Sequence, residues 1–177
     1  MDGRQITIFC AASDKIDPKY NIAARELVRA LHSRGYALVS GGGAIGTMGA
    51  ITDESIKVGG RHTAVLPGFM KGLENTGIGQ LLWTETMAER KTAMRSQTVA
   101  AIALPGGIGT LDELVETHVL KKLGKYDGKV MALNLDGFYN PLKALMDHYV
   151  NTGMLEPKDR DLLLFPESVN EVLEILG

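Results

Sequence analysis

Short apolar segments recur along this chain, and segments with helical periodicity lie between them. Most of the apolar segments are apolar at every position rather than at alternate positions, which is typical of strands covered on both faces of a sheet. We therefore predict six strands, at residues 6–12, 36–40, 62–67, 81–84, 100–105 and 130–135.

The segments between the predicted strands carry the signals of helices. Over 18–34, apolar residues recur at a spacing of three and four, Asp17 supplies an N-cap ahead of a proline, and Gly35 ends the pattern. Two later segments, 138–150 and 166–176, behave similarly and each open near a proline. Strand and helix in alternation predict an α/β fold, an open, doubly wound parallel sheet with helices on both faces.

The composition is that of an ordinary globular protein. The 177 residues are 45% hydrophobic and 23% charged, which predicts one domain over residues 1–177. The net charge is −2 and the basic residues are scattered, so we expect no nucleic-acid partner. No apolar run approaches the roughly 18 residues of a membrane span, and the N-terminus lacks the apolar run of a signal peptide. We expect a cytoplasmic protein that does not contact a membrane.

The cysteine and the histidines offer no metal or disulfide chemistry. The single cysteine, Cys10, cannot form an internal disulfide and is expected to pack as a small buried hydrophobic residue. The four histidines are dispersed without ligand spacing, so we expect no zinc or other metal site.

A first glycine-rich loop, 40–50, follows the second predicted strand and precedes a helix. Gly41, Gly43 and Gly46 satisfy the G-x-G-x-x-G pattern of dinucleotide-binding loops. The pattern nevertheless follows the second strand rather than the first, and no carboxylate stands about 20 residues further on, near Leu66, to hold a ribose. A dinucleotide is therefore disfavoured, and tight strand-to-helix packing is the alternative explanation for these glycines.

A second glycine-rich loop, in the stretch LPGGIGTLDE, precedes a helix predicted over about 110–122. Gly106, Gly107 and Gly109 leave backbone N–H groups uncovered where that helix begins, which is a ready site for a phosphate. Thr110 adds a hydroxyl group. The Gly-Lys-Ser/Thr of a nucleotide triphosphatase is missing, so a monophosphate fits better than a triphosphate.

The pattern T-x-x-E has two interpretations. Thr110 and Glu113 have the spacing of a capping box, in which both side chains satisfy backbone N–H groups at a helix start. The same pattern recurs at Thr86 and Glu89, and the sequence alone does not separate a cap from a catalytic group.

Arg90 and Lys91 follow in the first turns of a predicted helix, where the helix dipole disfavours cations. Function can override such a local preference. The alternative is a solvated pair of basic residues on a helix face.

Three motifs together resemble the Lonely Guy family of cytokinin-activating enzymes, which are often mislabelled as lysine decarboxylases. The family's P-G-G-x-G-T-x-x-E is present at 105–113, its R-K-x-x-M at 90–94, and its G-G-G-x-x-G-x-M-G at 41–49. The likeness runs nearly end to end and includes LNLDGFYNPL at 133–142.

The resemblance implies a Rossmann-like homodimer that hydrolyses the N-glycosidic bond of a cytokinin riboside 5′-monophosphate, or of AMP in many bacterial members. The products are the free base and ribose 5-phosphate, and no cofactor is needed. The family's catalytic arginine and glutamate fall on Arg90 and Glu113, and a substrate-binding glutamate falls on Glu74, in a stretch that aligns poorly. The further substrate-binding residues that we expect are Gly42, Gly43, Lys91, Gly106, Gly107, Ile108, Gly109, Thr110 and Glu116.

These residues support a mechanism for cleaving ribose from a purine, which passes through an oxocarbenium-like transition state. Glu113 is positioned to stabilise the positive charge and to activate the attacking water. Glu116 shares its helix face and is a candidate for holding the ribose hydroxyls. Arg90 either anchors the phosphate or assists departure of the base, and the sequence leaves both roles open.

The sequence departs from the family pattern at positions that border the expected pocket. Ala88 replaces a histidine, Val99 replaces an aspartate, and Ala12 ends an Ala-Ala pair where the family has Gly-Ser. Lys125 and Tyr126 replace Ile-His. These changes bear on which base is preferred more than on the reaction.

Two other functions compete with the hydrolase. A nucleotide-binding or molybdenum-cofactor carrier protein would use the same loops without turnover, and retention of both Arg90 and Glu113 favours the enzyme. A pyridoxal-phosphate lysine decarboxylase would need a Schiff-base lysine, and no lysine in the sequence is set apart as one.

Overall fold

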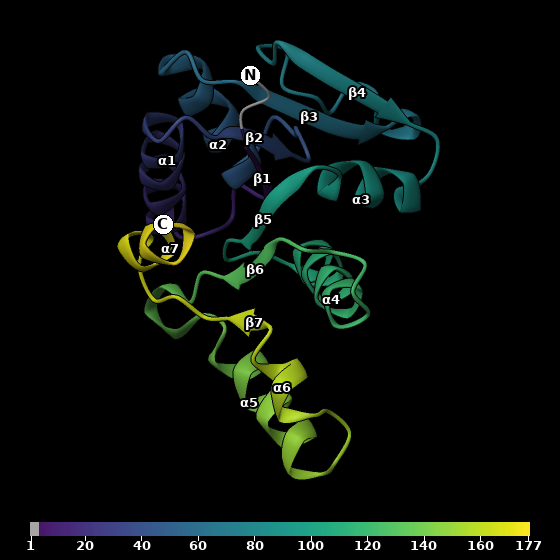
Figure 1. Cartoon of the computed structure of the whole chain (residues 1–177). Coiled ribbons are helices and arrows are strands. Elements are labelled where there is room, and N and C mark those ends of the chain that lie inside the picture. Colours follow the sequence, from purple (N-terminus) through teal and green to yellow (C-terminus); the bar gives the residue numbers. More distant parts are fainter. Residues whose placement is uncertain (1–3) are drawn as a thin grey trace.

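The computed structural model describes residues 4–177, and its centre is one parallel sheet of seven strands (Figure 1). The strand order is β4-β3-β2-β1-β5-β6-β7, and every neighbouring pair is parallel. The strands are β1 (Gln5–Phe9), β2 (Ala37–Ser40), β3 (His62–Pro67), β4 (Gln80–Thr84), β5 (Thr98–Ala103), β6 (Lys129–Ala132) and β7 (Leu163–Leu164).

Helices cover both faces of the sheet (Figure 1). The cluster of buried side chains on one face is formed with α1, α2 and α7, and the cluster on the other face with α3, α4 and α5. The helices are α1 (Pro18–Ser33), α2 (Gly46–Lys57), α3 (Met87–Arg95), α4 (Ile108–Lys122), α5 (Asn140–Asn151), α6 (Pro157–Arg160) and α7 (Val169–Leu176). The predicted doubly wound parallel sheet is therefore confirmed.

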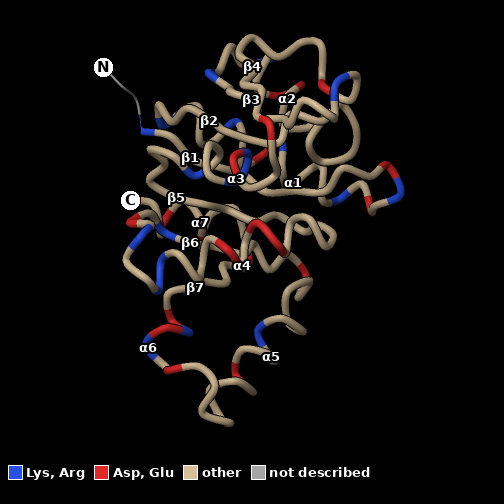
Figure 2. Tube along the Cα trace, turned by 90° about the vertical axis from the view of Figure 1, so that its right-hand side faces the viewer, with Lys and Arg blue, Asp and Glu red and all other residues tan. Residues whose placement is uncertain are grey.

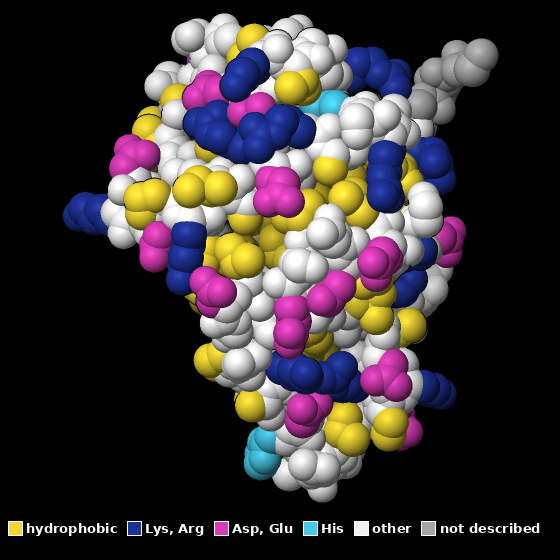
Figure 3. Space-filling view, turned by 90° about the vertical axis from the view of Figure 1, so that its left-hand side faces the viewer, with side chains coloured by type: hydrophobic (Ala, Val, Ile, Leu, Met, Phe, Trp, Pro, Cys, Tyr) yellow, Lys and Arg dark blue, Asp and Glu magenta, His cyan; other side chains and the backbone are white. Residues whose placement is uncertain are grey.

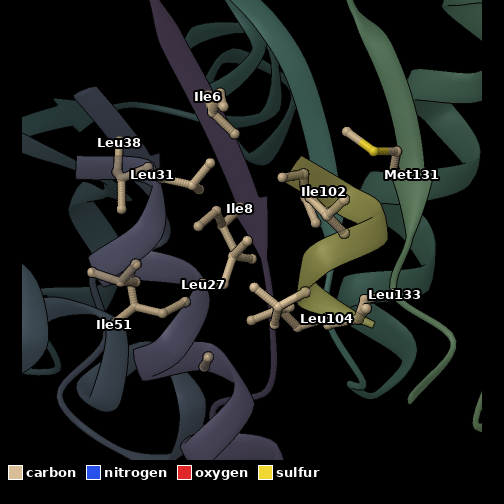
Figure 4. Close-up of a cluster of buried hydrophobic side chains, with 14 of the residues drawn as sticks. Ile6, Ile8, Leu27, Leu31, Leu38, Ile51, Ile102, Leu104, Met131 and Leu133 are labelled. Atoms are coloured by element: carbon tan, nitrogen blue, oxygen red, sulfur yellow. The ribbon is translucent and has the colours of Figure 1, made fainter. Parts of the chain in front are cut away.

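The central strand shows why the predicted strands are apolar at nearly every position. In β1, Ile6 and Ile8 pack toward α1 and α7, whereas Phe9 belongs to the cluster on the opposite face. Figure 4 shows Ile6 and Ile8 beside Leu27 and Leu31 of α1. Both faces of the strand are buried, so apolar residues occupy positions on both faces, although Thr7 is buried as well.

The first helix begins and ends where the sequence predicted. The Asp17 carboxylate accepts a hydrogen bond from the Lys19 N–H at 3.0 Å, which caps α1. Gly35 follows the helix with a φ of 80°, in the left-handed region that glycine enters without steric cost.

The face covered by α1 and α2 carries intermingled basic and acidic side chains (Figure 3). Arg25 and Arg29 of α1 lie 3.5 and 3.0 Å from the buried carboxylate of Glu54 on α2. The buried charge of Glu54 is thus compensated by two arginines. Within residues 4–177, no helix combines the length and the apolar character needed to cross a bilayer.

The strand order places a switch point between β1 and β5. From β1 the chain builds the sheet outward through β2, β3 and β4, and the later strands β5, β6 and β7 extend it on the other side. Ligands of such sheets bind in the crevice beyond the carboxyl ends of the strands at this point. The two glycine-rich loops follow β2 and β5, so both open onto this edge.

Candidate active site

Helix α3 begins with a capping arrangement, which is one of the two interpretations of its T-x-x-E. Thr86 is the N-cap, and its hydroxyl oxygen accepts a hydrogen bond from the Glu89 N–H at 3.1 Å. The Glu89 carboxylate in turn accepts one from the Glu85 N–H at 2.9 Å. Both side chains of this T-x-x-E are therefore engaged with the backbone of the helix start, as the capping interpretation predicts.

Helix α4 begins differently, and the capping interpretation is wrong for its T-x-x-E. The N-cap is Gly107, which has no side chain to offer, and the helix starts at Ile108 rather than near residue 110. Thr110 and Glu113 consequently lie inside the helix, and neither caps it. Both are buried, so their side chains face the protein.

The second glycine loop exposes backbone at the start of α4. Gly107 and Gly109 are exposed, and a Cβ at either position would meet no atom within 4 Å. The earliest backbone bond of the helix runs from the Leu111 N–H to the Gly107 carbonyl at 3.1 Å, so the N–H groups that precede it have no partner within the helix. At Gly106, by contrast, a Cβ would collide with the Thr110 hydroxyl, so glycine is required there for Thr110 to lie against the loop.

A buried ion pair joins α3 to α4. The Arg90 guanidinium Nη1 donates to the Glu113 carboxylate at 2.6 Å, and the two side chains are 8% and 6% exposed. Arg90 Nε also donates to the carbonyl of Val65, at the end of β3, at 3.0 Å. Burial raises the pKa of Glu113 above its usual range, and the charge of Arg90 opposes that rise. The two predicted catalytic residues are therefore in direct contact.

A second set of ion pairs lies beside the first, on the same two helices. Figure 2 marks the acidic positions along α4. Lys91 lies 2.9 Å from Asp112 and 2.7 Å from Glu116, and Arg95 lies 3.1 Å from Glu116. Burial opposes ionisation of Glu116, but the hydrogen bonds from Lys91 and Arg95 outweigh it and hold the pKa of Glu116 below its usual range. Lys91 and Glu116, both predicted to bind substrate, are thus bonded to each other.

The first glycine loop packs against Arg90. A Cβ at Gly41 would collide with Arg90 Nη2, so only glycine leaves room for the guanidinium at this point. Gly42 has a φ of 69°, and a Cβ there would collide with Ala64 of β3. These positions account for two of the glycines by close approach, as the packing interpretation expects.

Glu74 lies beside the same loop. Gly43 and Glu74 form an antiparallel bridge, and the Glu74 carboxylate accepts a hydrogen bond from the Gly72 N–H at 2.6 Å. On either side of the bridge, the Ala44 N–H donates to the Leu73 carbonyl and the Asn75 N–H donates to the Gly42 carbonyl, each at 3.0 Å. The predicted residues Gly42, Gly43 and Glu74 are therefore brought together.

An apolar cleft of about 410 Å³ opens between the first glycine loop and the segment that carries Glu74. Arg90 is the charged residue of its lining. The large apolar side chains that line it are Met48, Leu66, Met70 and Leu73, with Ile45 and Ala12. The cleft thus offers an apolar surface next to the guanidinium of the buried pair.

Sequence analysis missed some contacts of the site and found others. Arg95 stands four residues after Lys91, so helical spacing could have placed both on one face. The Val65 carbonyl has no sequence signal, since any residue carries one.

Cys10 is buried as predicted, and burial together with the nearby charge of Glu113 raises the pKa of its thiol. Within residues 4–177, no group of three or more His, Cys, Asp or Glu side chains is arranged to hold a metal ion.

Solved structures of known proteins share this fold. The molybdenum cofactor binding protein from Rippkaea orientalis superposes with a TM-score of 0.76 at 19% identity, covering 99% of this chain and 96% of that one. The Moco carrier protein from Chlamydomonas reinhardtii superposes with a TM-score of 0.71 at 18% identity, covering 98% and 95% of the two chains. At such identities the likeness concerns the fold alone.

Sequence comparison identifies the family. Residues 48–176 match the family model described as "Possible lysine decarboxylase". A probable cytokinin riboside 5′-monophosphate phosphoribohydrolase of Oryza sativa subsp. japonica is 38% identical over 98% of this chain and 72% of its own length. A cytokinin riboside 5′-monophosphate phosphoribohydrolase of Arabidopsis thaliana is 37% identical over 98% of this chain and 81% of its own length. The chain therefore belongs to the Lonely Guy family, which its three motifs resemble and which its family model labels as possible lysine decarboxylases.

Proposed function

We propose that this protein hydrolyses the N-glycosidic bond of a purine ribonucleoside 5′-monophosphate, of the cytokinin type or AMP, to the free base and ribose 5-phosphate. The observation that carries the proposal is the buried Arg90–Glu113 pair at 2.6 Å, set between an uncovered helix start and an apolar cleft. Relatives named as phosphoribohydrolases support the same reaction.

The start of α4 is the proposed phosphate site. Its first N–H groups have no partner within the helix, the loop glycines leave them uncovered, and the helix dipole favours an anion there. Thr110, held against Gly106, adds a hydroxyl donor. The loop Gly106–Thr110 thus fixes the phosphate and, through it, the position of the ribose relative to Glu113.

Glu113 is the proposed group that meets the reacting sugar. As the bond to the base breaks, positive charge develops on the ribose ring, and a carboxylate beside the anomeric carbon stabilises it. The same carboxylate then accepts a proton from the attacking water. No covalent intermediate is needed, because the water supplies the oxygen and the base leaves with the bonding electrons.

Arg90 is proposed to serve the leaving base rather than the phosphate. Its guanidinium lines the apolar cleft, whereas the proposed phosphate site lies at the start of α4. A purine in the cleft would present its developing negative charge to this cation. The apolar walls, including Met48, Met70 and Leu73, suit a base that carries a hydrocarbon substituent.

Lys91 and Glu116 are proposed to act without touching the substrate. Their ion pair, with Asp112 and Arg95, ties α3 to α4 along the turns next to Arg90 and Glu113. The Glu74 carboxylate accepts a hydrogen bond from the Gly72 N–H of its own segment. We therefore propose that the main role of Glu74 is to shape the wall of the cleft, and that binding a ribose hydroxyl is secondary.

We also propose that the protein acts as a homodimer through the outer faces of α4 and α5. Val115 and Val119 on α4, and Leu145 and Tyr149 on α5, are each 42–46% exposed around an apolar groove of about 300 Å³. The row of apolar side chains on α4 begins at Ile108 in the phosphate loop, so a second copy docked here would lie next to the site. Light scattering of the wild type and of Val119→Glu tests this, with a dimer expected for the wild type and a monomer for the variant.

A cytoplasmic location is proposed with the function. Cys10 is a free, buried thiol, and this does not distinguish one compartment from another. The support for the cytoplasm is the proposed substrate class, since nucleoside monophosphates are intracellular metabolites.

The test of the reaction is direct. Purified protein is incubated with AMP and, separately, with isopentenyladenosine monophosphate, and the free base and ribose 5-phosphate are quantified by chromatography. Equal amounts of the two products are expected. Saturable binding of both nucleotides without release of either base would contradict the proposal and favour a carrier.

A further inference from the structure

A histidine–serine pair lies where the first glycine loop leaves the sheet, with the serine buried and the histidine partly buried. Ser40, the last residue of β2, is fully buried, and its hydroxyl lies 2.8 Å from Nε2 of His62, the first residue of β3. The same hydroxyl oxygen accepts a hydrogen bond from the Gly42 N–H at 3.3 Å. Ser40 therefore connects the histidine ring to the backbone of the loop.

The hydrogen bonds continue from the loop to the cleft. The Gly42 carbonyl accepts from the Asn75 N–H, and the Ala44 N–H donates to the Leu73 carbonyl, each at 3.0 Å. Leu73 lines the apolar cleft, as do Gly43 and Ala44 of the loop itself. Hydrogen bonds thus run from His62 through Ser40 to Gly42, and the next residue along the chain, Gly43, lines the cleft.

The loop has little other freedom at this point. Gly42 lies in the left-handed region, and a Cβ there would collide with Ala64 and Leu66 of β3. Its N–H points to Ser40, and its carbonyl points to Asn75. The Ser40 hydroxyl is therefore the side chain that fixes the direction of the Gly42 peptide.

The Ser40 hydroxyl bonds to both the loop and the histidine. Its oxygen accepts from the Gly42 N–H, and it bonds to Nε2 of His62 as donor or acceptor according to the tautomer of the ring. Burial lowers the pKa of His62 to about 4, so the ring is neutral near pH 7. Within residues 4–177, Nδ1 of His62 has no hydrogen-bond partner, so Ser40 anchors the ring.

We propose that Ser40 and His62 are positioning residues that set the Gly42–Gly43 turn and, through it, the wall of the nucleotide cleft. Neither residue touches the reacting atoms. The inference rests on the proposed function of the cleft, because it assigns that cleft to the substrate.

A second histidine–serine pair provides a matched control. His32 Nε2 lies 3.1 Å from the Ser55 hydroxyl, between α1 and α2, and His32 Nδ1 lies 3.0 Å from the Tyr36 carbonyl. The chemistry is the same and both rings are partly buried, but this pair has no hydrogen bond to the glycine loop. Removing it reports the general effect of losing a buried hydroxyl.

The experiment compares Ser40→Ala, His62→Leu and His62→Gln with Ser55→Ala. For Ser40→Ala and His62→Leu we expect KM for AMP to rise about 5- to 20-fold, which corresponds to the loss of one hydrogen bond. We expect kcat to stay within about twofold of the wild type. The amide of His62→Gln can still bond to the Ser40 hydroxyl, so this variant should recover most of the wild-type KM. Ser55→Ala should leave KM unchanged.

Amide hydrogen exchange provides a readout that needs no substrate. In Ser40→Ala the amides of Ala44 and Asn75 should exchange at least about tenfold faster, with no such change in Ser55→Ala. Unchanged exchange and unchanged KM in Ser40→Ala would overturn the positioning role. Failure of the proposed reaction would show instead as a wild type that releases no base. Faster exchange confined to the Ser40 and His62 variants would even then support their role in positioning the loop.

Discussion

The same four-residue pattern stands near the start of two neighbouring helices and has a different role in each. In α3, Thr86 is the N-cap, and both Thr86 and Glu89 bond to backbone N–H groups at the helix start. In α4, the helix begins at Ile108, ahead of the pattern, and Glu113 turns inward to meet Arg90. Glu89 is exposed, whereas Glu113 is buried.

The difference shows that the position of a pattern relative to the helix start decides its chemistry. When the threonine is the N-cap, the glutamate is engaged by the backbone. When a glycine is the N-cap, as Gly107 is in α4, the helix starts earlier and the glutamate lies on an interior face. The uncapped N–H groups then remain for a ligand, and the freed carboxylate can be buried against a cation.

The largest expected effect comes from removing Arg90, the ion-pair partner of Glu113 in α4. Arg90→Met would leave Glu113 buried without its cation, so we expect the free energy of unfolding to fall by about 3–5 kcal/mol. Lys91→Met breaks neighbouring but more exposed pairs and should cost about 1 kcal/mol or less. Urea denaturation measures both, and equal losses would contradict the distinction between the two sets of ion pairs.

The next effect concerns the loop that starts α4. In Gly106→Ala, the new methyl group would collide with the Thr110 hydroxyl and displace it from the loop. We expect KM for AMP to rise about tenfold or more, because the variant loses a hydrogen bond from Thr110 to the charged phosphate. Gly79→Ala, where a Cβ meets no atom within 4 Å, is the control and should leave KM unchanged.

The two threonines should separate stability from binding. Thr86→Ala removes a helix cap and should lower the free energy of unfolding by about 1 kcal/mol, with little change in KM. Thr110→Ala removes no cap, so it should cost less than about half as much stability and raise KM for AMP instead. Thermal unfolding and steady-state kinetics decide this, and a larger stability loss in Thr110→Ala would restore the capping interpretation.

The smallest expected effect is on pH dependence. In the proposed mechanism Glu113 acts as a carboxylate, and burial raises its pKa, so activity should fall on acidification at a pH above the usual range of a glutamate. The charge of Asp112 contributes to the raised pKa of Glu113. In Asp112→Asn the acidic limb of kcat/KM should therefore move to lower pH, and a shift in the other direction would assign that limb to another group.

The sequence predicted the architecture because strands buried on both faces are apolar at nearly every position. The predicted strand ends were less accurate at the carboxyl ends of the strands, where the candidate site lies. The first strand was expected to run through residue 12 but ends at Phe9, and the fifth was expected over 100–105 but spans Thr98–Ala103. In both places the apolar run continues past the sheet, where Cys10 and Leu104 are buried and the exposed Ala12 lines the cleft. Strand β7 has only two residues and helix α6 only four, which is too short for any periodicity.

The site was predicted in part. Motif spacing singled out Arg90 and Glu113 as candidates, but their contact depends on how α3 and α4 pack, and they stand 23 positions apart in the chain. Glu116 was placed correctly on the face of Glu113, yet it pairs with Lys91 and Arg95, which approach from the other helix. Tertiary partners of this kind leave no local pattern in a single sequence.

The most direct test of the account compares the two glutamates. Base release from AMP is measured for Glu113→Gln and Glu89→Gln beside the wild type, with circular dichroism to confirm that each variant is folded. The account predicts that Glu113→Gln loses at least about 100-fold in kcat, the lower range for a catalytic acid–base group, whereas Glu89→Gln stays within about twofold of the wild type. A Glu113→Gln variant that retains the wild-type rate would contradict it.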